Sequence, residues 1–344
     1  MVKNDWTVLE CLEDMIAKSP LLDNKDWLAK RRTGLGGSDT PAIMGLSPWS
    51  DQAMVYASKV LDLPPIKTTI SMERGNYLEP LVSKLFAEQI NMEVISPSAY
   101  DTCPENGEIF DKSERIFEHP YYPFILASID SFLYDHEKKR IGILEIKTAC
   151  GYGCAKWDEG VPDMYVVQLQ KYMMIIQYIL EEQYGLDIKI FGYMAYLLDD
   201  KFDYTEEIAP DIELWSIIEQ ADIEFWDKHI LKLEAPEPTT LDSAKKLYSQ
   251  KVSKGYKQID VDVVLIMKKF KELKDNQKEL DAPVNKIKQD IDAMQLYILN
   301  EIQLHDKLLY GDNVVATYLP DKHGTKRLSV KYATVSKILN ELKQ

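Results

Sequence analysis

The sequence has few of the residues that build disulfide frameworks and metal–thiolate sites. Its 344 residues include 4 cysteines and 5 histidines. The cysteines are irregularly spaced, and the pair in "CGYGC" has no second pair to complete a four-ligand zinc site. The histidines show no HExxH-type spacing. These shortages argue against a disulfide scaffold, a structural zinc site and an iron–sulfur cluster.

Long apolar runs are also missing. The richest apolar stretch, "MMIIQYIL", is far shorter than the ~20 residues that cross a bilayer. The opening residues, "MVKNDWTVLECLEDM", carry acidic side chains early and lack the apolar segment of a signal peptide. We therefore expect a cytoplasmic protein that makes no membrane contact.

Positive charge is scarce overall. The chain has 41 Lys and Arg against 56 Asp and Glu, which gives a net charge of −15 and argues against a general nucleic-acid coat protein. The charge is uneven, because residues 245–288 hold 12 Lys and 6 Asp and Glu. An enzyme that contacts a polyanion only in a narrow groove remains compatible with this composition.

The order of the expected elements favours an α/β fold. Apolar periodicity predicts helices at 69–92, 164–182 and 212–231, a β-hairpin at 125–149 and a buried strand at 188–198. This order fits a mixed central β-sheet with helices packed on both faces.

A linker divides the chain. The segment "EAPEPTTLDSAKK" has the proline and threonine content of a boundary. We predict a core at 1–235 and a lysine-rich extension at 236–344. The extension is expected to form one long helix kinked at Pro283, or a helical pair, followed by a β-hairpin at 307–332. Its lysines either face solvent or contact DNA or a partner.

The first hairpin carries three charges inside apolar strands. It reads "ILASIDSFLYDHEKKRIGILEIKTA", with Asp130 in the first strand and Glu145 and Lys147 in the second. With a turn near residue 137, Asp130 and Glu145 lie opposite each other, roughly 5–6 Å apart at Cβ. Two carboxylates this close repel each other unless a cation lies between them.

Two interpretations explain these charges. An ion pair of Lys147 with Glu145 or Asp130 on an exposed sheet face would need no function. The flanking "ILASI" and "IGIL" instead favour central strands, where ion pairs are weak stabilisers. A divalent metal held by the carboxylates removes the repulsion, and hard oxygen ligands suit Mg²⁺ or Mn²⁺. We therefore predict a metal site.

The pattern D–x₁₄–E–x–K resembles the signature of the PD-(D/E)xK nuclease superfamily. Further stretches make the resemblance more specific, and over roughly residues 25–230 the chain resembles the YqaJ-type viral recombinase and phage lambda exonuclease family. These stretches are "WLAKRRTGLGGSDTPAIMGLSPW", "MERGNYLEP", "LASIDSFL" with "LEIKTA", and "VVQLQKYMMI". The resemblance implies a restriction-endonuclease-like core.

The resemblance also implies a role for each matching residue. Asp130 and Glu145 would ligate Mg²⁺ together with the backbone carbonyl of Ile146. Lys147 would orient the attacking water, and Glu79 would reach the same site, through a water or a second metal. The remaining residues implied are Gln168 near the water or the scissile phosphate, Arg31 and Ser38 on the 5′-phosphate of a DNA end, and Ser128 supporting the site next to Asp130.

Several of these residues also have an ordinary explanation. The alternatives are an exposed helix arginine for Arg31, an N-cap for Ser38, a polar spacer for Gln168 and a helix-favouring acid for Glu79. An N-cap lies at an anion site, so the two roles of Ser38 are compatible. The planar fork of an arginine suits a terminal phosphate.

The function implied is a Mg²⁺-dependent 5′→3′ exonuclease acting on linear double-stranded DNA. It would generate 3′ overhangs for phage-type recombination, with a single-strand annealing protein as partner, in a bacterial host and of phage or prophage origin. A homo-oligomer is expected, with a ring as one form that the extension puts in question. The alternatives are a structure- or site-specific endonuclease of the same fold and a catalytically inactive DNA- or partner-binding module.

Overall fold

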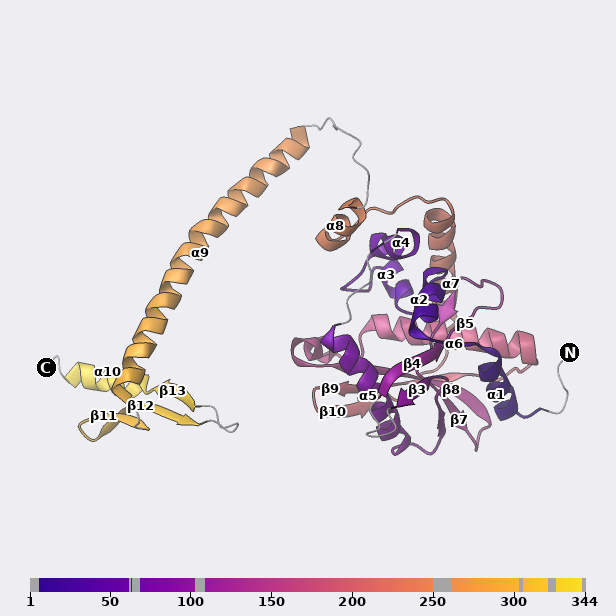
Figure 1. The fold of residues 1–344 in the computed structure, drawn as a ribbon, viewed down its shortest axis with the longest axis horizontal. Coiled ribbons are helices and arrows are strands. Elements are labelled where there is room, and N and C mark those ends of the chain that lie inside the picture. The colour runs from indigo at the N-terminus through magenta and orange to yellow at the C-terminus, as the bar shows by residue number, and fades with distance from the viewer. Residues whose placement is uncertain are drawn as a thin grey trace. The chain divides into compact units, whose positions relative to one another are not determined.

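The computed structural model describes residues 6–61, 63, 69–102, 109–249, 261–302, 306–320 and 326–341. The chain divides into two compact units, Met1–Val252 and Ser253–Gln344 (Figure 1). The two units are described separately.

A five-stranded mixed sheet forms the centre of the first unit. Its strand order is β10–β9–β8–β7–β2, with β8 and β9 parallel and the other neighbours antiparallel. The strands are β2 (Glu93–Ile95), β7 (Ser131–Asp135), β8 (Arg140–Ala149), β9 (Phe191–Leu198) and β10 (Lys201–Tyr204). The predicted α/β class, with a mixed central sheet flanked by helices, is confirmed.

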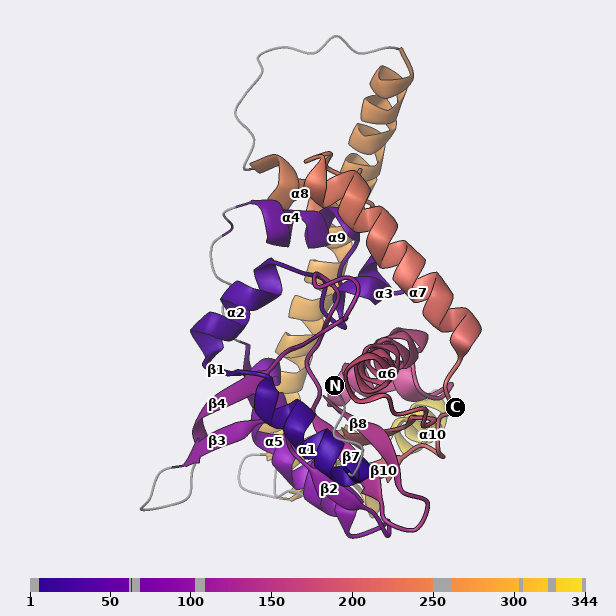
Figure 2. The ribbon, with the colours of Figure 1, turned by 90° about the vertical axis from the view of Figure 1, so that its right-hand side faces the viewer.

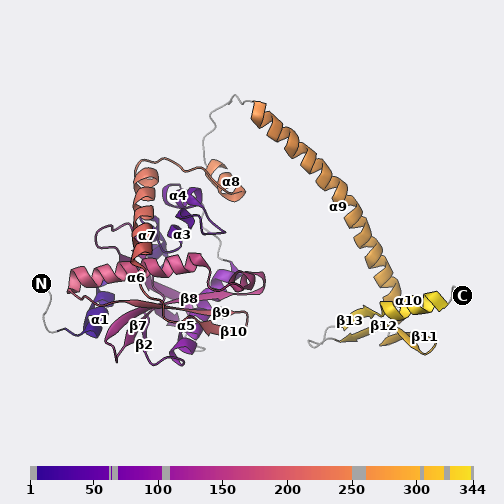
Figure 3. The same ribbon diagram turned by 180° about the vertical axis from the view of Figure 1, so that it is seen from behind.

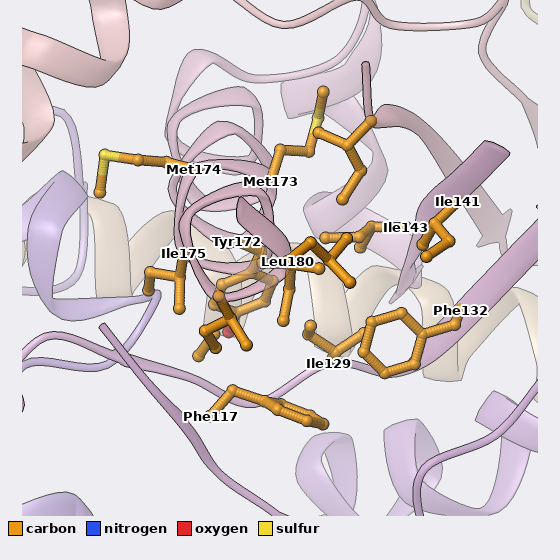
Figure 4. Close-up of a cluster of buried hydrophobic side chains, with 14 of the residues drawn as sticks. Phe117, Ile129, Phe132, Ile141, Ile143, Tyr172, Met173, Met174, Ile175 and Leu180 are labelled. Atoms are coloured by element: carbon orange, nitrogen blue, oxygen red, sulfur yellow. The ribbon is translucent and has the colours of Figure 1, made fainter. Parts of the chain in front are cut away.

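Two long helices cover the two faces of this sheet. Helix α6 (Asp163–Tyr184) connects the parallel strands β8 and β9, and α5 (Ile70–Ala87) packs on the opposite face (Figure 3). The core under α6 combines Phe132, Ile141 and Ile143 of the sheet with side chains of the helix (Figure 4). A second core joins α5 to the other face.

The alternation along β8 decides where its charged residues point. Leu144 and Ile146 are buried in the core beneath α5, whereas Ile143 lies beneath α6. Because successive strand residues point to opposite faces, Glu145 and Lys147 lie on the face of α6. Leu144 and Ile146 are both buried, on the opposite face of the strand from Glu145 and Lys147.

The predicted register of the hairpin is also confirmed. Ser131 pairs with Leu144 and Asp135 with Arg140, as a turn near residue 137 requires. The ordered pairing begins at Ser131. Asp130 therefore lies one residue before β7, at the end of the hairpin rather than inside the strand.

Helix α6 extends over the predicted range but is buried on almost all sides, not on one face. Of its 22 residues, 14 are buried. Figure 2 shows it end-on, with the sheet below it and α7 (Ile212–Phe225) packed across it. The polar residues Gln168 and Lys171 therefore occupy packed positions rather than a solvated face.

The other elements of the first unit are short. The helices are α1 (Val8–Lys18), α2 (Asn24–Arg32), α3 (Asp39–Ile43), α4 (Gln52–Val60), a 3₁₀ helix (Gly151–Trp157), a π-helical segment (Trp226–Leu231) and α8 (Leu241–Ser249). The small strands are β1 (Leu21–Leu22), β3 (Ala99–Thr102), β4 (Ile109–Arg115), β5 (Phe117–Glu118) and β6 (Leu126–Ala127).

The end of the first unit is held by one carboxylate. Asp51, at the start of α4, accepts hydrogen bonds from the Thr239 N–H at 2.8 Å and the Ser243 hydroxyl at 2.6 Å. These bonds tie α8 to α4. The domain boundary that we placed at 235/236 stays a prediction.

The second unit contains one long helix and a small sheet. Its elements are α9 (Val261–Ile302), β11 (Lys307–Tyr310), β12 (Asn313–Pro320), β13 (Lys326–Val330) and α10 (Tyr332–Glu341). The expected hairpin is part of a three-stranded antiparallel sheet, although residues 321–325 lie outside the described residues. Of the two forms predicted for the extension, the structure has one continuous helix through Pro283. Among the described helices, none has the length and apolar content needed to cross a bilayer.

Candidate active site

Charged groups meet where β8 extends past the end of β7. Beyond the Ser131–Leu144 pair, β8 continues along β9. There the Asp130 Oδ2 accepts a hydrogen bond from the Ile146 N–H at 2.7 Å. The N–H and C=O of one strand residue point to the same edge, so the Ile146 carbonyl also faces the side of Asp130.

Glu145 is the most deeply buried acid of this group, with a relative exposure of 1%. Its Oε1 accepts hydrogen bonds from Gln168 Nε2 at 2.8 Å and from Lys147 Nζ. Its Oε2 is buried and has no hydrogen-bond partner among the described residues. An unpaired buried oxygen is costly, so this atom points to a ligand that the protein itself does not supply.

Burial and nearby negative charge raise the pKa of both carboxylates. Burial raises the pKa of Asp130 to about 7, and the negative charge of Glu145 adds to the effect. Burial likewise raises the pKa of Glu145, against the opposing charge of Lys147. Burial alone would lower the pKa of Lys147, but the two carboxylates outweigh it and the pKa is raised. Lys147 therefore remains protonated at neutral pH.

This donor set fits a divalent cation. Two carboxylates and a backbone carbonyl, from Asp130, Glu145 and Ile146, are hard oxygen ligands of the kind that Mg²⁺ and Mn²⁺ prefer. A cation would also stabilise the charged form of both carboxylates and so oppose the rise in pKa that burial and neighbouring negative charge cause. The described part of the chain has no group of three or more His, Cys, Asp and Glu side chains arranged to hold a metal.

The third expected carboxylate, Glu79 on α5, is engaged by a lysine. Both of its oxygens accept from Lys112 Nζ, at 2.9 and 2.8 Å. Glu79 is nevertheless close enough to contribute to the raised pKa of Glu145. The positive charge of Lys112, on β4, acts on Asp130 and Glu145 in the opposite direction. Sequence reasoning missed Lys112, because no motif surrounds it.

The two residues expected at a 5′-phosphate are in contact with each other. Arg31, in the last turn of α2, donates from Nη2 to the Ser38 Oγ at 3.0 Å. Ser38 occupies the N-cap position of α3, but its side chain makes no capping hydrogen bond. The guanidinium lies 4.9 Å from the ring centroid of Trp27 and 3.9 Å from the Asp39 carboxylate.

Tyr172 packs against Gly37, next to Ser38, and also contacts the residues around Glu145. Its hydroxyl accepts a hydrogen bond from Gln168 Nε2 at 3.0 Å, and the same amide group donates to Glu145. Burial raises the pKa of Tyr172 well above its usual value, and the charge of Glu145 contributes. Sequence reasoning missed Tyr172, although its i, i+4 spacing from Gln168 places both on one side of α6.

Ser128 joins a different set of contacts from the one expected. Its hydroxyl donates to Glu114 Oε2 at 2.9 Å and accepts from Trp27 Nε1 at 3.3 Å. Trp27 also lies beneath Arg31, and Glu114 lies 3.5 Å from Lys112. Ser128 therefore lies between the Arg31 region and the Lys112 region.

A fully buried ion pair holds the glycine-rich loop in place. Lys171 and Asp222 are both 0% exposed at the side chain and 2.8 Å apart. Lys171 Nζ also donates to the carbonyls of Leu35 and Gly36, at 2.8 and 3.2 Å, and to Thr40 Oγ1 at 2.8 Å. Sequence reasoning did not identify this pair, whose members are 51 residues apart.

A pocket of about 610 Å³ lies next to the charged cluster. Tyr165 lines it, and the same ring lies 5.0 Å from Lys147 Nζ. The wall includes Trp157, stacked on Tyr165 with ring centroids 5.5 Å apart. At its edge, Trp49 is 60% exposed and Lys156 Nζ lies 3.7 Å from its ring centroid.

Residues 26–178 match the YqaJ-like viral recombinase domain. The resemblance inferred from the motifs is thereby confirmed. The matched range includes every residue that we assigned to the site, from Arg31 to Gln168.

Three individual proteins align with this chain in sequence or in structure. The chain is 27% identical over 323 residues to the uncharacterized protein YqaJ of Bacillus subtilis (strain 168), covering 90% of this chain and 91% of that protein. An alkaline exonuclease (LHK-Exo) from Laribacter hongkongensis aligns with 17% identity and a TM-score of 0.43, over 61% of this chain and 94% of its own. The structure of SSO0001 aligns with 13% identity and a TM-score of 0.32, over 70% and 91%. Both TM-scores are low, so the fold class rests on the sheet topology described above.

Proposed function

We propose that this protein is a Mg²⁺-dependent nuclease that degrades linear double-stranded DNA from its 5′ ends. The 3′ overhangs that it leaves would serve recombination by single-strand annealing, with an annealing protein as partner. The observation that carries the proposal is the Glu145 Oε2 beside Asp130, which is buried and has no hydrogen-bond partner in the part of the chain that the structure describes. The match to a viral recombinase domain supports it.

The chemistry follows from the donors at the end of β8. Asp130, Glu145 and the Ile146 carbonyl would hold the Mg²⁺ ion, with Mn²⁺ as a substitute. When bound, such an ion activates a water molecule and neutralises charge on the phosphate. The protonated Lys147 donates a hydrogen bond to the attacking water and fixes its position. Gln168 holds the Glu145 carboxylate in place through Oε1.

Glu79 completes the site in this proposal. Its carboxylate, now paired with Lys112, lies close enough to Glu145 to affect its pKa. From there it would accept a hydrogen bond from a water in the coordination shell. Lys112 would then form an ion pair with a phosphate oxygen of the DNA instead of with Glu79.

The direction of digestion is proposed from Arg31 and Ser38. A guanidinium with a neighbouring hydroxyl offers several donors to a terminal phosphate, and the fork binds two of its oxygens at once. Tyr172 packs against Gly37, next to Ser38, and Gln168 joins Tyr172 to Glu145, so a 5′-phosphate held by the pair would lie near the hydrolytic site. Ser128 supports the pair through Trp27.

The aromatic pocket beside Lys147 would accept the strand being degraded. Base stacking on exposed aromatic rings and contacts with nearby cations are how proteins hold unpaired strands. Trp49, Lys156 and Arg74 line this pocket and supply both features. This pocket is therefore suited to bind DNA, although the chain as a whole carries a net negative charge.

The experiment is digestion of a linear duplex with either a 5′-phosphate or a 5′-hydroxyl, in Mg²⁺ and in EDTA. We expect Mg²⁺-dependent release of nucleotides from the phosphorylated 5′ end, and its loss in Asp130→Ala. Asp200→Ala, an exposed turn residue, is the matched control and should keep full activity. Nicking of closed circular DNA without end preference would replace the proposal by an endonuclease. Absence of any cleavage would leave a binding module.

A further inference from the structure

The long helix of the second unit exposes a stripe of apolar side chains. α9 has 42 residues and is about 63 Å long at 1.5 Å per residue. Eight of the apolar residues that are more than half exposed on this helix form the stripe. They are Ile266, Phe270, Leu273, Leu280, Val284, Ile287, Ile291 and Met294. A continuous exposed stripe of this length is characteristic of an association surface.

The spacing of this stripe is that of a coiled coil. Apart from the seven-residue step from Leu273 to Leu280, its members follow one another in alternating steps of four and three residues, which is the a and d pattern of a heptad repeat. Gln277 fills the one remaining a position between Leu273 and Leu280. Between residues 268 and 292, every position outside this repeat is polar or charged except Ala282 and Pro283. A strict seven-residue repeat keeps the stripe facing a partner helix along its length.

We propose that α9 pairs with α9 of a second copy of this chain in an antiparallel two-stranded coiled coil. A narrow stripe with only a and d positions apolar fits one partner helix rather than a broader bundle core. The proposal does not depend on the nuclease activity.

The flanking charges decide the orientation. In a parallel pair, each g residue faces the e residue of the next heptad of the partner. Lys269 would then face Lys274, and like charges there are unfavourable. Each of the other facing g and e positions would combine a charged side chain with a neutral side chain or a proline. Two parallel helices therefore gain no contact between opposite charges.

An antiparallel pair removes this conflict. In that orientation e residues face e residues and g residues face g residues. In the register that places Phe270 opposite Met294, Asp281 faces Lys288 and Lys269 faces Asp290. The register shifted by one heptad, with Ile266 opposite Ile291, would instead place Lys274 opposite Lys288. Two-fold symmetry makes each contact twice, which gives four opposite-charge pairs. The helix is therefore complementary in charge to a second copy of itself, and this complementarity identifies the occupant of the stripe.

The first test measures the mass of the full chain in solution by light scattering at micromolar concentration. We expect twice the chain mass of 39.7 kDa. Leu280→Asp, at a d position, should return the protein to the monomer mass. Leu296→Asp is the matched control, because Leu296 is 60% exposed on the outward face of the same helix. It should leave the dimer intact, and circular dichroism checks that both variants keep their helix content.

A monomeric parent protein overturns the proposal. So does a Leu280→Asp variant that keeps its full helix content and remains dimeric, because the contact would then lie elsewhere. A mass of three or more chains that Leu280→Asp abolishes overturns the two-stranded arrangement.

The second test fixes the orientation by disulfide cross-linking. In the antiparallel pair, residue 277 of one helix faces residue 287 of the other. The double variant Gln277→Cys with Ile287→Cys should therefore form a covalent dimer on mild oxidation. The single variant Gln277→Cys should not, and the parent protein controls for its native cysteines. Efficient cross-linking of the single variant would show a parallel pair and overturn the arrangement proposed here.

Discussion

Gly37 and Tyr172 are packed so closely that a Cβ at Gly37 would lie 2.3 Å from the Tyr172 hydroxyl oxygen. The tyrosine hydroxyl accepts from Gln168, which also holds Glu145. The loop after Arg31 and the buried carboxylates are thus joined by direct packing. Position 37 requires glycine because its backbone lies so close to the Tyr172 ring that no room remains for a Cβ atom.

Gly37→Ala is therefore expected to damage both packing and function. The added methyl must displace the Tyr172 ring, at a cost of about 1–3 kcal/mol in unfolding free energy. Urea denaturation measures this cost, and the preference for 5′-phosphorylated ends should fall with it. Gly153→Ala is the control, because its Cβ would meet only Ala149 at an ordinary 3.6 Å. Equal effects of the two substitutions would contradict the role given to the contact.

Asp130 makes the metal-free protein sensitive to alkaline pH. Its pKa in the folded state is about 7, above the ordinary 3.8. The folded state therefore binds this proton more tightly than the unfolded state. The resulting stability is complete below pH 4 and is lost as the pH rises through 7.

Asp130→Asn should consequently stabilise the protein in EDTA at pH 8, by about 1–4 kcal/mol. The difference in unfolding free energy between this variant and the parent protein should decrease as the pH falls toward 4. Unfolding in urea at several pH values measures it. A variant that is less stable than the parent at pH 8 would show that the carboxylate is not penalised there.

Mg²⁺ binding should offset the destabilisation that the ionised Asp130 carboxylate causes at pH 8. A ligand that binds the folded state at one hundred times its dissociation constant stabilises it by about 2.7 kcal/mol. We expect the melting temperature of the parent to rise on adding Mg²⁺ at pH 8. Asp130→Asn and Glu145→Gln should lose this rise, whereas Asp200→Ala should keep it. A rise in all four proteins would place the cation elsewhere.

Arg31 should govern the choice of DNA end rather than the hydrolysis itself. Arg31→Lys keeps the charge but loses the two-pronged donor. We expect the ratio of rates on 5′-phosphorylated and 5′-hydroxyl ends to fall by about one to two orders of magnitude, the cost of 1.4–2.8 kcal/mol. Mg²⁺-dependent cleavage should remain measurable. An unchanged ratio would remove the guanidinium from the end-binding site.

The parts of this site that the sequence predicted are those encoded locally. The register that brings Asp130 opposite the strand of Glu145 follows from the alternation of side chains and the position of the turn. The family motif carried Arg31 and Ser38, which lie seven residues apart and touch. Their contact needs only one helix end and one short loop.

The parts that the sequence did not predict depend on distant segments. Lys112 meets Glu79 across 33 residues, and Lys171 meets Asp222 across 51. A lysine in an apparently amphipathic helix gave no sign of burial, because α6 is enclosed by the sheet, α3 and α7 only in the folded chain. Tertiary packing, not local pattern, places these charges.

The buried pair of Lys171 and Asp222 gives the last prediction. Removing one partner leaves an uncompensated charge in the interior, so Lys171→Met should cost about 3–5 kcal/mol in unfolding free energy. The double variant Lys171→Met with Asp222→Leu should regain much of this loss, because no charge remains buried. The Leu35 and Gly36 carbonyls would still lack their donor, so the recovered protein should keep a reduced preference for 5′-phosphorylated ends. Urea denaturation and the two-substrate digestion separate these effects. A recovered stability with full end preference would limit the pair to a structural role.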